Sequence, residues 1–247
     1  MHNLLSVTFR RAFFKKRFYI GLGFILFIGD MMLFFANDGS NAHVDNMPFA
    51  VVSFLPMLIG ITGGLYISQD YTNNTIRNKI IAGHSRTNIY LSNLITSMLG
   101  TLIIYGLYVL LVLGIGSAII GVSDSFDMAH EMKSILMFLG IFWTFTSLTV
   151  MFCMMLDGVS GTVISALLYI LFGLSTIIMA FVENETLIKI FVYLNPTLYI
   201  SYVDEYAMRT ELEDDFIDIY KIVIASIVYI IASTGFGIFV FNKKDIK

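Results

Sequence analysis

Apolar residues lie along the chain in six runs of about 20 residues, separated by shorter polar segments. Each run is close to or above the roughly 20 residues that a helix needs to cross about 30 Å of hydrocarbon. The runs lack the period-2 pattern of a half-buried strand and the period-3.6 pattern of a surface helix. We therefore expect an all-α integral membrane protein with six transmembrane helices, at residues 18–36, 48–68, 89–121, 134–156, 159–182 and 222–241.

Basic residues gather in alternate segments between these runs. The segments 1–17, 69–88, 157–158 and 242–247 hold 11 of the 15 lysine and arginine residues. Basic segments are retained on the cytoplasmic side of a membrane, so both termini are expected in the cytoplasm. The external loops 37–47, 122–133 and 183–221 then carry most of the acidic residues. Because the net charge of −3 sums two opposite faces, it gives no indication of a nucleic-acid partner.

The first 17 residues predict an interfacial helix. At 100° per residue, Phe9 and Phe13 share an apolar side that would enter the headgroup boundary, while Arg10 and Arg11 lie mostly elsewhere and would meet anionic lipid. The alternative is a basic flank of the first span with no helix of its own.

The polar segment 69–88 predicts a short helix along the cytoplasmic surface. Asn74 and Thr75 are good N-cap types and Gly83 is a good helix stop. Between them, isoleucines are assigned to one side and polar residues to the other: Ile76, Ile80 and Ile81 against Arg77, Asn78 and Lys79. Ser85 would cap the third span, which at about 50 Å either projects from the bilayer or breaks near Gly114 and Gly116.

Two further segments have features of helix packing. Gly60 and Gly64 form a small-xxx-small pair, which suits close contact between helices. In the external loop 183–221, Asn195 and Pro196 interrupt a mostly apolar stretch, because proline disfavours one continuous helix. We expect two re-entrant half-helices there before span six; an ordinary exposed loop is the alternative.

Asp30 is the charged residue that lies well inside a predicted span. Intramembrane carboxylates are costly and point to function by default. Because Asp30 lies in the outer part of the first span, a structural role and a place on a transport pathway both stay open.

Several kinds of chemistry are excluded by residue counts and spacing. Cys153 is the only cysteine, so neither an intrachain disulfide nor a cysteine metal cluster can form. The sequence has no His-Glu-x-x-His motif and no Gly-x-x-x-x-Gly-Lys-Ser/Thr loop. We expect no metal site, no catalytic residues and no nucleotide hydrolysis by this chain alone.

The segment from Asp70 to Ile95 resembles the first cytoplasmic loop of ABC-2-type transporter permeases. Those commonly read acidic-x-x-x-Gly-Thr-Ile-Arg-Asn-Lys, then Gly-x-Ser-Arg, then Tyr-x-x-Lys. The matching residues are Asp70, Thr75, Ile76, Arg77, Asn78, Lys79, Gly83, Ser85, Arg86 and Tyr90. Asn74 replaces the usual glycine and Asn93 the usual basic residue. The ending from Phe241 to Lys247 is also similar to that of the family.

This resemblance implies that residues 1–247 form a single transmembrane permease domain in a bacterial cell membrane. A second permease chain, identical or homologous, would complete a two-fold assembly with two copies of a separate ABC ATPase, which binds ATP and Mg. The helix between spans two and three would sit in a groove of the ATPase. Its coupling residues would be Asp70, Thr75, Ile76, Arg77, Asn78, Lys79, Ile80, Gly83, Ser85 and Arg86.

Peptide or antibiotic export is the function expected within this family. Apart from Asp30, the predicted spans are uncharged and rich in Phe and Met, which suits an amphipathic peptide or hydrophobic antibiotic rather than an ion or sugar. Lipid or glycan export is the alternative. An ion-coupled secondary transporter would need more buried ionisable groups and internal repeats, and a non-transporting membrane scaffold is a further possibility.

Overall fold

The computed structural model describes residues 2–14, 16–36, 55–119, 121, 126–179, 184–207 and 219–245. These residues form helices and turns, with no strand among them. The helices are α1 (His2–Phe13), α2 (Lys16–Ala36), α4 (Leu55–Thr72), α5 (Thr75–Ile81), α6 (Arg86–Ile119), α7 (Met128–Met155), α8 (Val159–Met179), α9 (Glu185–Leu194), α10 (Pro196–Ala207) and α11 (Ile219–Lys243).

The described parts of all six predicted runs are helical, in α2, α4, α6, α7, α8 and α11. Within the described residues, α6, α7 and α11 are long and apolar enough to cross a membrane, and Val159–Ser175 of α8 is a shorter apolar helix. The number of six spans stays a prediction. Residues 48–54 and the acidic stretch 211–218 lie outside the described residues. Asp30 is in α2, but its side chain is not among those described.

One predicted run begins earlier as a helix than expected, and the alternative left open for the third run is decided. Helix α7 begins at Met128 rather than at residue 134, because the Asp127 side chain caps it by accepting a hydrogen bond from the Ala129 amide at 3.0 Å. Helix α6 runs unbroken past Gly114 and Gly116 for 34 residues. It therefore extends about 50 Å and would project beyond about 30 Å of hydrocarbon.

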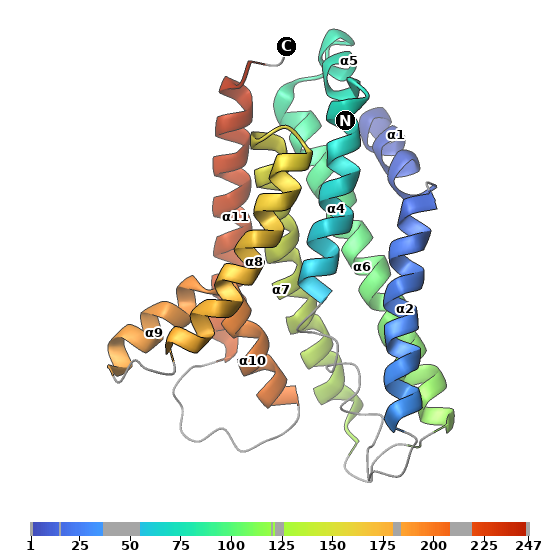
Figure 1. The fold of residues 1–247 in the computed structure, drawn as a ribbon, viewed down its shortest axis with the longest axis vertical. Coiled ribbons are helices and arrows are strands. Elements are labelled where there is room, and N and C mark those ends of the chain that lie inside the picture. The colour runs from blue at the N-terminus through green and yellow to red at the C-terminus, as the bar shows by residue number, and fades with distance from the viewer. Residues whose placement is uncertain are drawn as a thin grey trace.

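Helix α7 is the centre of the bundle and packs against α4, α6, α8, α10 and α11. Its buried aromatic residues Phe138 and Phe142 meet Tyr105 of α6 in the main hydrophobic cluster. Helix α1, α5, the turn between α7 and α8 and the C-terminus lie at one end of the bundle (Figure 1), whereas α9 and α10 lie at the other. Both termini are thus at the same end, as the distribution of basic residues predicts.

The expected pair of short helices before the last span is confirmed as α9 and α10, which meet at Asn195. The Asn195 side chain is buried and donates to the Phe172 carbonyl at 3.0 Å and to Ser175 Oγ at 2.6 Å. Its Oδ1 accepts from the Thr197 amide, and Pro196 begins α10, where its missing N–H costs nothing. These contacts anchor the break between the two helices to α8.

The glycine pair in α4 makes the expected close helix contact. A Cβ on Gly64 would lie 2.6 Å from Thr162 Oγ1 of α8, and a Cβ on Gly60 would lie 3.4 Å from Thr149 Oγ1 of α7. A Cβ on the neighbouring Gly63 would meet no atom within 4 Å.

We expect Gly64→Ala to destabilise the chain by about 1–3 kcal/mol, because the added methyl group overpacks the contact with α8. Gly63→Ala is the matched control and should be neutral or stabilising, since alanine is the better helix former. Thermal unfolding of both variants in detergent measures the difference. Equal midpoints for the two variants would contradict close packing at Gly64.

Candidate functional site

The segment that resembles the family loop lies at the same end of the bundle as the two termini, where α4 turns into α5. Asp70, in the last turn of α4, is the centre of the site. Its side chain is 1% exposed, even though it carries a carboxylate. A buried carboxylate needs opposite charge close by, because an unpaired charge in a low-dielectric interior is very costly.

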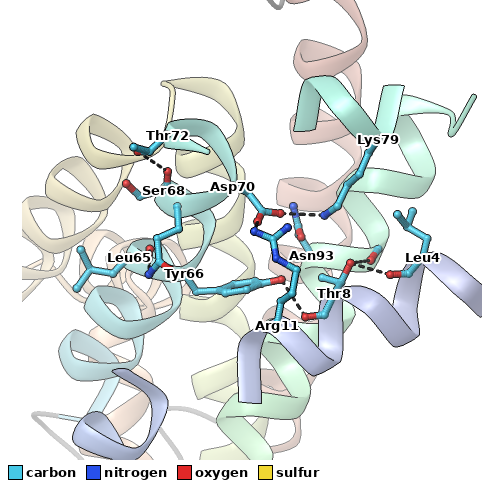
Figure 2. Close-up of polar contacts among 12 residues, drawn as sticks. Leu4, Thr8, Arg11, Leu65, Tyr66, Ser68, Asp70, Thr72, Lys79 and Asn93 are labelled. Atoms are coloured by element: carbon cyan, nitrogen blue, oxygen red, sulfur yellow. Dashed lines mark hydrogen bonds and ion pairs between the residues drawn. The ribbon is translucent and has the colours of Figure 1, made fainter. Parts of the chain in front are cut away.

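Two cations from two other helices supply that charge (Figure 2). Lys79 Nζ of α5 donates to Asp70 Oδ2 at 2.8 Å, and Arg11 Nη2 of α1 lies 3.0 Å from Asp70 Oδ1. The Arg11 contact is an ion pair without an aligned hydrogen bond, since Oδ1 has no hydrogen-bond partner of good geometry. Lys79 is 7% exposed and Arg11 25% exposed. We call these three residues the Asp70 triad.

The Asp70 triad joins the consecutive helices α4 and α5 to α1, which is far from them in sequence. Removing one partner of a buried ion pair is strongly destabilising because it strands the other charge. Asp70 therefore holds α5 against the end of α4 and holds α1 against the same point. A displacement of α5 would be transmitted directly to α4 and α1.

Hydrogen bonds next to the triad fasten α1 further. Tyr66, one turn before Asp70 in α4, donates to the Thr8 carbonyl at 3.2 Å. Ser92 of α6 donates to Thr8 Oγ1 at 2.9 Å, and Thr8 Oγ1 donates to the Leu4 carbonyl at 2.8 Å. Thr8 and Leu4 are both buried. The side of α1 that packs on the bundle is thus partly polar.

This packing corrects part of the expectation for the N-terminal segment. The segment forms helix α1, and Phe9 and Phe13 do share one side of it, but that side packs partly on the bundle instead of facing outward as a whole. Phe13 is buried and Phe9 lies at 36% exposure, with ring centroids 4.2 Å apart. Arg10 is exposed, whereas Arg11 turns inward to Asp70.

Backbone geometry explains why α5 is short and where it points. Asn74 precedes α5 with φ of 51°, in the left-handed region that glycine and asparagine tolerate best. The replacement of the family's usual glycine by Asn74 is therefore compatible with the turn. Gly83, with φ of 85°, ends α5, and Ser85 caps α6 by accepting from the Asn88 amide at 3.3 Å.

The faces of α5 differ from the expected ones. Ile76 is fully buried and Ile80 half-buried, but Ile81 is 74% exposed. Lys79, expected on the exposed side, is buried on Asp70. The exposed side consists of Arg77, Asn78 and Ile81, which we call the α5 outer face.

Arg86 and the C-terminal residues close the site from another side. The Arg86 guanidinium donates to the carbonyls of Phe241 and Asn242, at 3.2 and 3.0 Å, and to that of Lys244. It thereby satisfies the last carbonyls of α11. Lys244 pairs with Asp157 in the turn between α7 and α8 at 2.5 Å. Arg86 thus has a structural role beside any role in coupling.

Sequence reasoning missed Arg11 as a partner of Asp70, and Lys244 as a partner of Asp157. No local pattern carries these contacts, because the residues are 59 and 87 positions apart. The burial of Lys79 did have a signal. At 100° per residue, Lys79 lies about 60° from Ile76 around the helix, whereas Ile81 lies about 140° from it.

Comparison with known proteins agrees with this arrangement. No curated protein gives a significant match to the chain. Residues 10–176 match the model of a family described as ABC-2 family transporter protein. The match includes α4, α5 and the Asp70 triad and covers more than half of the chain. The protein therefore belongs to the ABC-2 family and is an integral membrane permease component of an ABC transporter.

Proposed function

We propose that this chain is the six-span permease half of a bacterial exporter driven by a separate ABC ATPase. Both termini and the α5 outer face lie in the cytoplasm, and two permease chains assemble with two ATPase subunits. The α9–α10 pair enters the outer leaflet as re-entrant half-helices. Proteins of this family generally work with an ABC ATPase.

The observation that supports this proposal best is that the α5 outer face is exposed while the opposite side of α5 is fixed to the bundle. Arg77 and Ile81 lie on the outer side of a helix whose inner side is fixed by Lys79 to Asp70 and by the buried Ile76. An exposed arginine beside an exposed apolar side chain is typical of an interface centre. Motion of a bound ATPase would pass through α5 to α4 and α1.

We expect the purified chain alone to hydrolyse no ATP, because it has no phosphate-cradling loop. Hydrolysis should appear only when a P-loop ATPase is bound. The experiment is affinity purification from native membranes, followed by mass spectrometry of bound proteins and an ATPase assay before and after a stringent wash. Activity that stays with the chain after all other proteins are removed would contradict a two-component transporter.

The proposed cargo is an amphipathic peptide or a hydrophobic antibiotic leaving the inner leaflet or the cytoplasm. Apart from Asp30 the predicted spans carry no charge and are rich in Phe and Met, which suits apolar rather than ionic solutes.

A strain lacking the gene should become more sensitive to membrane-active peptides and should accumulate them. Growth inhibition and intracellular peptide are measured, with surface glycan and lipid composition followed in parallel. Unchanged sensitivity together with lost surface glycan or lipid would reject a peptide as the cargo and favour lipid or glycan export. A Lys133→Glu strain, in which the changed residue is exposed on α7 and lies outside the α5 outer face, is a control that should export normally.

A further inference from the structure

A cavity of about 350 Å³ lies between α2 and α4, with α6 and α7 behind it and the end of α1 at one side. Its size is within the range of small-molecule sites, about 300–1,000 Å³. Phe18, Phe24, Leu58 and Ile104 are among its apolar lining residues, and it shares no residue with the α5 outer face. The coupling mechanism proposed above does not use this space.

The cavity is elongated along the helices. Its lining extends from Leu58 to Gln69 on α4 and from Thr96 to Ile104 on α6. At 1.5 Å per residue these stretches are about 16 and 12 Å long. One leaflet contributes about half of a hydrocarbon core of 30 Å, or about 15 Å. The cavity therefore has the length of one leaflet and runs in the direction that a lipid chain takes.

Its rim is apolar and exposed. Ile20 and Phe24 of α2 and Leu65 of α4 line the cavity and are 69%, 52% and 39% exposed. Helix α2 packs mainly against α6 and touches α4 less extensively, with a close approach of Gly21 to Thr62, so the cavity opens beside that contact. In a membrane protein this side opening faces hydrocarbon, so an occupant would enter from the bilayer rather than from water.

Two hydroxyl groups distinguish one end of the cavity. Thr96, which is 1% exposed, and Ser97 both line it, and their Oγ atoms are buried without a hydrogen-bond partner. Gly100, one turn further along α6, lies against the Phe13 ring, so these hydroxyls are at the depth of α1. Rotation about χ1 would turn either hydroxyl towards an occupant. A lipid ester carbonyl at the headgroup boundary, where α1 is expected to lie, would accept such hydrogen bonds.

Basic residues flank the same end in sequence. Arg10 and Lys16 are exposed and stand on either side of Ala12 and Phe13, which line the cavity. Basic groups at a membrane surface attract anionic headgroups. We infer that the cavity binds one acyl chain of an anionic phospholipid, with its ester carbonyl at Thr96 and Ser97 and its phosphate beside Arg10 and Lys16.

Filling the cavity tests this inference. Gly63 lines it, and a Cβ there would meet no atom within 4 Å, so Gly63→Leu places a side chain in the space of the acyl chain. Gly106→Leu, on α6 outside the cavity and equally open, is the matched control. The full chain is purified in detergent, incubated with phosphatidylglycerol carrying a photoreactive acyl chain, irradiated and mapped by mass spectrometry.

We expect labelling of Phe24 and Ile104 in the natural chain and in Gly106→Leu, and at least about a tenfold loss in Gly63→Leu. Phosphatidylcholine with the same acyl chain should label less, and Arg10→Gln/Lys16→Gln should remove this difference. Equal labelling in both glycine variants would overturn the acyl-chain site, and equal labelling by both lipids in the natural chain would overturn the preference for anionic lipid. A photoreactive amphipathic peptide that labels these residues in place of lipid would also overturn the acyl-chain site.

Discussion

Asp70→Asn is expected to destabilise the chain by about 3 kcal/mol or more, because it leaves Lys79 without its buried counter-charge. Arg11 loses the same partner, although at 25% exposure it can turn towards water. Helix α5 would then be held only by the packing of Ile76 and Ile80. We expect loss of export together with the loss of stability.

Cys153 provides the measurement. It is the single cysteine of the chain and is fully buried, so its labelling by a thiol-reactive fluorophore reports opening of the bundle. Labelling of Asp70→Asn should begin at lower temperature than labelling of the natural chain. Asn78→Ala, on the α5 outer face, should label like the natural chain.

The double variant Asp70→Leu/Lys79→Met separates a stranded charge from lost packing. It replaces the closest ion pair by apolar side chains, a change that is often neutral for buried pairs. We therefore expect it to be more stable than Asp70→Asn alone. If Asp70→Asn and the natural chain label at the same temperature, the triad does not hold the three helices together.

Arg77→Glu/Ile81→Asp is expected to prevent capture of the ATPase while the permease keeps its fold. Both side chains lie on the α5 outer face, and neither contributes to the Asp70 triad. Loss of an arginine and an apolar contact at an interface centre typically costs about 2 kcal/mol or more. Binding is measured by copurification and by ATP-dependent export in membrane vesicles.

Lys133→Glu is the matched control for this variant, because it reverses an exposed charge in the first turns of α7, at the end of that helix away from the turn between α7 and α8. It should bind the ATPase normally. Cys153 labelling checks that the α5 variant is folded. A change at Lys79 is unsuitable for this test, since it would break a buried ion pair and confuse docking with stability. Normal ATPase recovery with Arg77→Glu/Ile81→Asp would remove the docking role from α5.

Much of the fold was predictable because a lipid environment leaves the backbone few choices. Hydrocarbon offers no hydrogen bonds, so each long apolar run is expected to close its own backbone hydrogen bonds as a helix. The start of α7 was missed by six residues because a single Asp127 side chain extends the helix into a polar segment. The sequence left undecided whether α6 is continuous, since glycine weakens a helix without ending it.

The short helix α5 was also predictable from the local sequence, because the turn-forming Asn74 stands before it and Gly83 stands after it. Its orientation was missed, although at 100° per residue Lys79 lies about 60° from the buried Ile76 and Ile81 lies about 140° from it. The family resemblance identified Asp70 and Lys79 as part of one motif. It gave no indication that the two form an ion pair.

The sequence by itself determined the helices, their order and the segment that resembles the family loop, because these depend on apolar run length, capping residues and local motif spacing. Only the tertiary structure decided which charges are buried and which are free to bind a partner. Arg11 and Asp70 become neighbours because α1 folds back along α6 beside the end of α4. Such contacts depend on how helices pack, and helix packing depends on side-chain shape across the whole bundle rather than on any local pattern.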